Sequence, residues 1–274
     1  PPRSTLFPYT TLFRSQQYVS ELLETNGGCK LPCFWGIEPG KSTEEEAVTM
    51  LQQLSPLGKP EIFSSGARVI NIEPTLFAQS DEIIIDPDVS EDMVVSFHFG
   101  DKLVKDYGFE AKALKGSYVY DYEPFGERLA RFRLPNVLAD MGIPGGVGIT
   151  TTKDNITRNG KQLIGGFSVY LFYPEQGFFI HYTTQARVVG KMVRGCLADA
   201  SIEIHAYPPG NASQFSDLLR FTGGEGRWPL FDSGFYRSIE TAMEMTPEQF
   251  YEKYSNPEND CMETAAELWN EADK

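Results

Sequence analysis

The stretch CKLPCFWGIEPGKST, residues 29–43, joins two cysteines to the start of a helix. Thr43 and Glu46 have the spacing of a capping box, and the apolar residues after them recur at helical intervals. This pattern predicts a helix from about 43 to 55. Pro39 and Gly40 are typical of a turn. The stretch therefore predicts a bend that begins the first helix.

Two chemical readings of this bend are disfavoured by spacing. A phosphate-binding loop needs a glycine five positions before its second glycine, whereas Gly36 lies four before Gly40, and Pro39 removes an amide donor. Cys29 and Cys33 are separated by three residues rather than the two of C-x-x-C, and no helix begins beside them to activate a thiol. The sequence therefore predicts a structural corner.

Four cysteines indicate how the chain is stabilised: Cys29, Cys33, Cys196 and Cys261. An even number without a C-x-x-C is typical of structural disulfides in an oxidising compartment. Spacing alone does not choose among the three possible pairings. We favour Cys29 with Cys33 and Cys196 with Cys261, and the alternative is four buried free thiols.

Charge and composition exclude some classes of partner. Acidic residues outnumber basic residues by 38 to 24 in 274 residues, giving a net charge of −14, which argues against nucleic acid. Aromatic residues form 13% of the chain, which favours a β-rich globular protein. No apolar run approaches the roughly 20 residues of a transmembrane helix.

Residues 1–15, PPRSTLFPYTTLFRS, have no helical or strand periodicity. They match the translation of a common sequencing adapter, so we expect them to be an artefact of sequence assembly and exclude them from fold reasoning. Without Arg3 and Arg14 the chain has 22 basic and 38 acidic residues, or −16. We expect the natural N-terminus before Gln16 to be lost, together with any signal peptide or lipid-attachment motif.

The chain contains two similar segments, each with one helix. In the first, residues 16–115, strands are predicted at 68–72, 83–85, 93–99 and 103–107, with a hairpin loop at 100–102. In the second, residues 116–207, Pro135 and Gly142 bound a helix over 134–141, and strands are predicted at 147–151, 167–173, 178–183 and 201–207. Each helix is followed by Gly-x-Pro and antiparallel strands. The sequence thus predicts an α+β protein with two repeated helix-plus-sheet units, chance similarity being the alternative.

The remaining residues, 208–274, predict a C-terminal helical segment. Asn211 begins one candidate helix, and Thr246, Pro247 and Gln249 combine an N-cap, a first-turn proline and a capping box. These signals predict a helix over 247–254. A last short helix is expected near 264–269, directly after Cys261.

Signals for catalysis, cofactors and metals are weak. His98, His181 and His205 fall in predicted strands without metal-ligand spacing, and no G-x-S-x-G occurs. Acidic pairs such as Asp86 and Asp88 lie in polar turns. We therefore assign no catalytic, cofactor-binding or metal-binding residue, and the only site residues are the four cysteines.

The head and tail motifs carry a family resemblance. Residues 28–40, read as Gly-Cys-x-Leu-Pro-Cys-x-Trp-Gly-Ile-x-Pro-Gly, and residues 261–269, CMETAAELW, resemble a group of uncharacterised bacterial extracytoplasmic proteins, many of which look like lipoproteins. The resemblance implies a compartment outside the cytoplasm and no activity. More loosely, the helix boundaries are similar to SmpA/BamE-like and β-lactamase-inhibitor-protein-like folds, which imply binding to other proteins.

From these patterns we expect an exported, non-enzymatic binding or envelope-associated protein, secreted or lipid-anchored. Its contact surface would be an exposed sheet face rich in Tyr and Phe, and membrane attachment would occur only through the lost N-terminal lipid anchor. The alternative is an enzyme of unfamiliar type with acidic residues in a groove between the two units.

Overall fold

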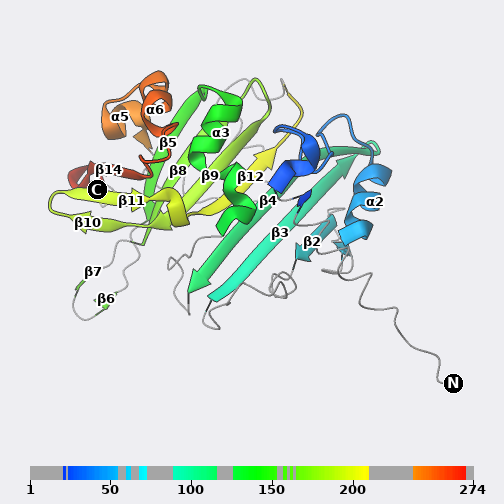
Figure 1. Ribbon diagram of the computed structural model, residues 1–274, viewed down its shortest axis with the longest axis horizontal. Helices are drawn as coiled ribbons and strands as arrows, with labels where there is room; N and C mark the ends of the chain where they lie inside the picture. Colours follow the sequence, from blue (N-terminus) through cyan, green and yellow to red (C-terminus); the bar gives the residue numbers. More distant parts are fainter. Residues whose placement is uncertain are drawn as a thin grey trace.

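A nine-stranded antiparallel sheet forms the centre of the α+β fold (Figure 1). The computed structural model describes residues 21–22, 24–54, 60–62, 68–72, 89–115, 126–152, 157–158, 161–162, 165–209 and 237–269. In spatial order, the strands of this sheet are β1 (Pro60–Ile62), β2 (Arg68–Ile72), β3 (Val89–Gly100), β4 (Leu103–Lys115), β12 (Ser201–Ala206), β9 (Phe178–Gln185), β8 (Gly166–Tyr173), β5 (Gly146–Thr152) and β13 (Arg237–Ser238).

Two smaller sheets and a few short helices complete the described chain. A three-stranded antiparallel sheet contains β10 (Arg187–Val189), β11 (Met192–Cys196) and β14 (Cys261–Ala265), and a two-stranded one contains β6 (Thr157–Arg158) and β7 (Lys161–Gln162). The helices are α2 (Glu44–Leu54), α3 (Leu134–Met141), α5 (Ile239–Met243) and α6 (Pro247–Tyr254), with 3-10 turns η1 (Asn26–Gly28), η3 (Gly126–Phe132), η4 (Leu197–Asp199) and η5 (Ala266–Trp269). None of the helices in the described ranges is long and apolar enough to cross a membrane.

Strand β12 joins the two halves of the main sheet. It pairs with β4 on one side and with β9 on the other, so that Ile204 lies between Phe109 and Ile180. Because side chains alternate along a strand, Ile204 and its neighbours Ile202 and Ala206 face the core while the residues between them face the opposite side. Strand β12 thus belongs neither to the β3–β4 hairpin of the first predicted unit nor to the β8–β9 hairpin of the second.

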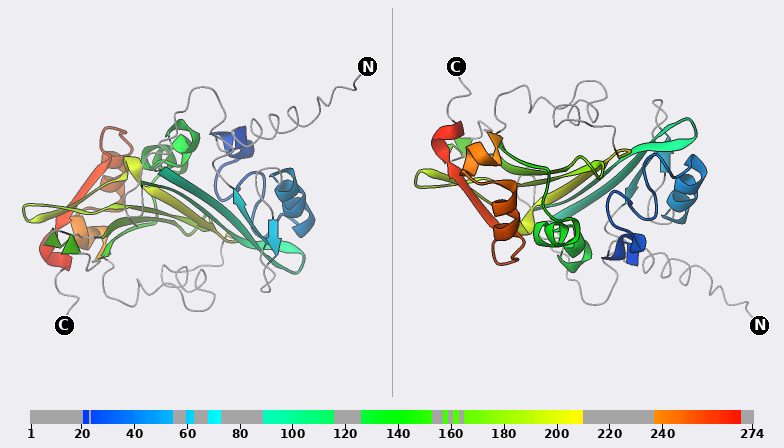
Figure 2. Two further views of the ribbon diagram at one scale, coloured as in Figure 1. Left: turned by 90° about the horizontal axis from the view of Figure 1, so that it is seen from below. Right: turned by 90° about the horizontal axis from the view of Figure 1, so that it is seen from above.

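One face of the sheet is covered by the head loop, η3 and α3 (Figure 2). Phe34 is fully buried there, with its ring centroid 4.9 Å from that of Phe109 and 6.0 Å from that of Phe132. The three-stranded sheet packs beside these elements, and a Cβ on Gly195 of β11 would lie 2.4 Å from the ring of Phe167 on β8. The core is therefore continuous from the head loop to the C-terminal strand.

Most local predictions are confirmed in the described ranges. Helix α6 has the bounds and the capping box that the sequence indicates, and α2 begins with the reciprocal bonds between Thr43 and Glu46. Strands β2, β3, β4, β5, β8, β9 and β12 occupy the predicted places, although β3 and β4 are longer than expected. The predicted strand at 83–85 and the helix from Asn211 lie outside the described residues.

The C-terminal prediction is partly wrong. The last helix was expected near 264–269, but residues 264 and 265 belong to strand β14 (Cys261–Ala265), and only 266–269 form a helical turn. Met262 and Thr264 are buried while the residues between them are not, because β14 pairs with β11 and alternates its side chains. Strand pairing to a distant segment therefore overrode the local helical pattern.

Candidate functional site

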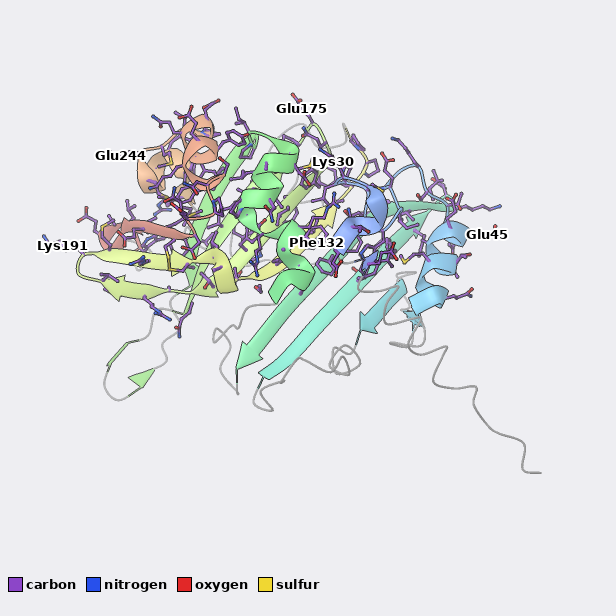
Figure 3. All side chains as sticks on the ribbon, in the orientation of Figure 1. Lys30, Glu45, Phe132, Glu175, Lys191 and Glu244 are labelled. Carbon is purple, nitrogen blue, oxygen red and sulfur yellow. A yellow bond between two sulfur atoms is a disulfide. The ribbon has the colours of Figure 1, made fainter. Side chains whose placement is uncertain are left out.

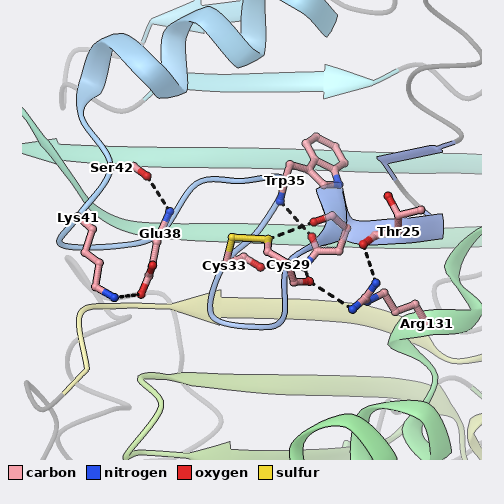
Figure 4. The surroundings of a disulfide bond; sticks show 9 residues. Thr25, Cys29, Cys33, Trp35, Glu38, Lys41, Ser42 and Arg131 are labelled. Atoms are coloured by element: carbon pink, nitrogen blue, oxygen red, sulfur yellow. Dashed lines mark hydrogen bonds and ion pairs between the residues drawn. A yellow bond between two sulfur atoms is a disulfide. The ribbon is translucent and has the colours of Figure 1, made fainter.

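The head loop is held by a disulfide and by one buried amide. Cys29 and Cys33 are bonded as predicted, and the Asn26 side chain donates hydrogen bonds to the carbonyl oxygens of both cysteines, at 3.0 and 2.7 Å. The Asn26 amide oxygen accepts a hydrogen bond from the Trp35 N–H, and Arg131 of η3 donates to the Cys29 carbonyl (Figure 4). The loop is thus fastened on both sides.

Backbone amides of this loop are used internally. Phe34 and Ile37 exchange two N–H···O bonds at 2.9 Å, Gly40 donates to Val104 of β4, and Ser42 donates to Glu38. A phosphate-binding loop needs several such amides turned towards one anion. Three of these donors instead bond within the loop and one bonds to β4, which supports the interpretation of residues 29–43 as a structural bend.

All three histidines lie on the face of the main sheet opposite the head loop. His205 of β12 is opposite Gly108, which in turn is opposite Ser96 of β3, two residues before His98. His181 of β9 is directly opposite Glu203 of β12. The sequence placed each histidine in a strand correctly but could not show that the strands bring them to one face.

Glu203 joins two of these histidines in one hydrogen-bonded network. Its carboxylate oxygens lie 3.0 Å from His181 Nδ1 and 2.6 Å from His205 Nε2. The network continues from His181 Nε2 to Thr183 Oγ1 at 2.8 Å and from there to Ser168 Oγ at 3.1 Å. We refer to Ser168, Thr183, His181, Glu203 and His205 as the polar network.

Electrostatics favour a charged Glu203. Burial raises the pKa of this carboxyl, but hydrogen bonds and opposite charge from His181 and His205 outweigh burial and hold the pKa well below its ordinary value. The rings of His181 and His205 stack on Tyr170 and Phe179, with centroids 4.1 and 4.8 Å apart. Within the described residues no group of three His, Cys, Asp or Glu side chains is arranged to hold a metal ion.

A second candidate site lies beside the second disulfide. A groove of about 550 Å³ is bounded by α5 and α6 on one side and by β11 and β14 on the other. Cys196 and Cys261, paired as predicted, are direct neighbours across these two strands, and Cys261 lines the groove. Glu244, which links α5 to α6 in a left-handed conformation, lies at its edge (Figure 3).

The groove combines an adaptable apolar lining with charged groups. Its lining includes three methionines and a leucine: Met192, Met243, Met245 and Leu268. Arg194 lies 3.7 Å from Glu263, and burial raises the pKa of Tyr254 to about 12, with a smaller contribution from Glu263. Cavities of this size with flexible thioethers and a few polar groups suit peptide or small-molecule binding.

Exposed apolar surface is not where the sequence suggested. Apart from Phe99, which is partly buried, the Tyr and Phe residues of the described sheet are buried, including Tyr107, Tyr170 and Tyr182. The large apolar residues that are exposed in the described part of the chain are Ile143, Val188 and Val189. Sequence reasoning missed the groove because it missed β10, β11, β14 and α5.

Comparison with known protein families, with curated proteins and with solved structures finds no match. What the fold and the site define is a class: a mixed α+β protein with two disulfides and an open groove beside its second disulfide. The two disulfides indicate an oxidising environment.

Proposed function

We propose that this is an exported, non-enzymatic binding protein of the cell envelope, which holds a segment of another protein in the groove between α5, α6 and the three-stranded sheet. The observation that carries the proposal is the 550 Å³ groove with its methionine lining. Methionine side chains adapt to different apolar partners, and the charged groups at the rim give orientation. A lipid anchor before Gln16 and the two-unit organisation, with 208–274 as a clasp, remain part of this proposal.

The strand order supports two groups of strands on either side of β12. Strands β1 to β4 lie on one side, and β9, β8 and β5 lie on the other, each group with its own helix earlier in the chain. The similarity of the β3–β4 and β8–β9 hairpins rests on sequence alone. The groove lies beyond the second group, next to the C-terminal segment.

A peptide selection tests the binding proposal. The immobilised protein would be screened with a displayed random-peptide library, and enriched peptides would be measured by fluorescence anisotropy against Met245→Arg and Leu268→Arg. We expect each change to weaken binding at least about tenfold, because it places a charge on an apolar wall. Ile143→Arg, at an exposed apolar residue outside the groove lining, should bind like wild type.

Circular dichroism and a thiol assay would show that the variants fold with both disulfides intact. Equal binding by all variants would place the peptide outside the groove, and a library that yields no peptide tighter than 1 mM would refute the proposal.

The polar network favours a second candidate function, a hydrolase. Thr183 Oγ1, His181 and Glu203 have the hydroxyl–imidazole–carboxylate order of a catalytic triad, with spacings of 2.8 and 3.0 Å. Against this, β9 is paired on both sides, so its backbone N–H groups are committed to the sheet rather than to an oxyanion. The binding proposal therefore ranks first.

A fluorophosphonate probe separates the two functions. The binding proposal expects no covalent labelling of the folded protein. Labelling that disappears in Thr183→Ala and falls in Glu203→Gln would instead establish the hydrolase.

A further inference from the structure

The hairpin of β10 and β11 has a surface unlike that of the rest of the chain. Residues 187–191 are all exposed, and Val188 and Val189 are 55% and 51% exposed. The segment 186–195 contains three basic residues and no acidic one, although the whole chain has a net charge of −14. Exposed valines and basic side chains together favour a partner that offers both an apolar phase and negative charge.

Figures 1 and 2 show that this hairpin projects from one end of the molecule in every view. Lys191 marks its tip in Figure 3. Strand β11 has five residues, so the tip extends roughly 15 Å beyond Cys196. Strand β14 pairs with β11 along its whole length, and the Ala266 N–H donates to the Lys191 carbonyl, so the C-terminal strand flanks the tip on one side. Arg194 lies 3.7 Å from Glu263 of β14, so the positive charge that the tip offers to a partner comes from Arg187 and Lys191.

The two valines point to opposite faces of the hairpin. Val188 is paired with buried Val193, and Val189 is paired with Met192, so the exposed side chains alternate across the strand. A partner strand added along β10 would cover its backbone edge and leave much of both side chains in water. A lipid interface surrounds a protruding tip and covers both sides at once.

We propose that the β10–β11 tip, residues 187–191, docks on an anionic lipid bilayer. Val188 and Val189 would enter the boundary between headgroups and acyl chains, while Arg187 and Lys191 would contact lipid phosphates. The contact is weak by itself, since stable anchoring takes two signals. This inference goes beyond the proposed function and does not depend on the groove.

Ile143 is the natural control for apolar exposure. It is 48% exposed, but no basic residue lies within four positions on either side, and Asp140 is close to it in sequence. It therefore offers exposed apolar surface without the positive charge that an anionic bilayer attracts.

Vesicle flotation tests the proposal with the full chain. The probes are unilamellar vesicles of phosphatidylglycerol and phosphatidylethanolamine, compared with phosphatidylcholine alone. We expect binding to the anionic vesicles only, weakened by 0.5 M NaCl. Each basic residue near an anionic surface strengthens binding about fivefold, so Arg187→Gln with Lys191→Gln should weaken it about 25-fold.

Further variants separate the tip from general charge. Val188→Ser with Val189→Ser should weaken binding about tenfold or more, whereas Ile143→Ser and the exposed Lys30→Gln should bind like wild type. With Val188→Trp, brominated lipid should quench fluorescence more strongly than with Ile143→Trp.

Three results would overturn the proposal. The first is no binding of wild type at 5 mM anionic lipid, and the second is equal binding by the tip variants. The third is a wild-type protein that does not bind vesicles but binds a peptide of alternating valine and glutamate through residues 187–191. That result would show that the tip binds an acidic polypeptide instead.

Discussion

Asn26 is a buried polar side chain that holds the first disulfide loop. It is fully buried, donates to two cysteine carbonyls and accepts from Trp35. Asn26→Ala should cost about 3 kcal/mol in the free energy of unfolding, because it leaves buried backbone groups unpaired. Urea denaturation would measure this. Exposed Asn136, which donates one hydrogen bond to Ala130, is the matched control, and a similar loss in Asn136→Ala would contradict the argument.

Glu203 makes the polar network sensitive to acid. Because the pKa of its carboxyl is lowered from 4.5 in the folded state, its contribution to stability is fully present above about pH 4.5 and is lost as the pH falls towards the depressed pKa. Between pH 4.5 and 2.5, the free energy of unfolding of Glu203→Gln should therefore fall by about 2 kcal/mol less than that of wild type. Glu45→Gln, at an exposed position of α2, should keep the wild-type slope. Parallel slopes for wild type and Glu203→Gln in pH-dependent urea titrations would show that the network does not titrate in this way.

At the scale of elements, the two disulfides close loops of very different length. Cys29 and Cys33 are separated by 4 positions, whereas Cys196 and Cys261 are separated by 65 and hold β14 against β11. Since closing a longer loop restricts the unfolded chain more, Cys196→Ala with Cys261→Ala should cost about 4 kcal/mol, compared with about 2 kcal/mol for Cys29→Ala with Cys33→Ala. Thermal unfolding of the two double variants would measure the difference. The reverse ranking would mean that native packing around the head loop outweighs loop length.

At the scale of the whole molecule, β12 makes the main sheet one structure. It pairs with a strand from each half, and Ile204 at its centre is fully buried. Ile204→Ala should cost about 3 to 4 kcal/mol. It should also lower hydrogen-exchange protection equally in the β3–β4 and β8–β9 hairpins, because both rest on β12.

Hydrogen exchange followed by mass spectrometry would check this coupling. Val188→Ala, at an exposed residue, should leave protection in the main sheet unchanged. A selective loss in one hairpin would show that the halves unfold independently, as two separate units would.

The sequence determined the features that depend on near neighbours. The capping boxes of α2 and α6, the hairpin turn before Leu103 and the turn at Pro39 and Gly40 were all predictable, because their signals lie within a few residues. The pairing of Cys29 with Cys33 was favoured for the same reason. With Cys29 and Cys33 paired, Cys196 and Cys261 are the remaining pair, but local sequence could not show that β11 and β14 bring them together.

Only the tertiary structure decided which distant residues meet. Glu203 reaches His181 across 22 positions, and β14 joins β11 across more than 60, because strand register is set by packing along the whole sheet rather than by local preference. The same long-range pairing turned 261–265 into a strand and placed the groove beside it. Local sequence determined the caps and turns, whereas the pairing of distant strands determined how far the strands extend and which faces they share.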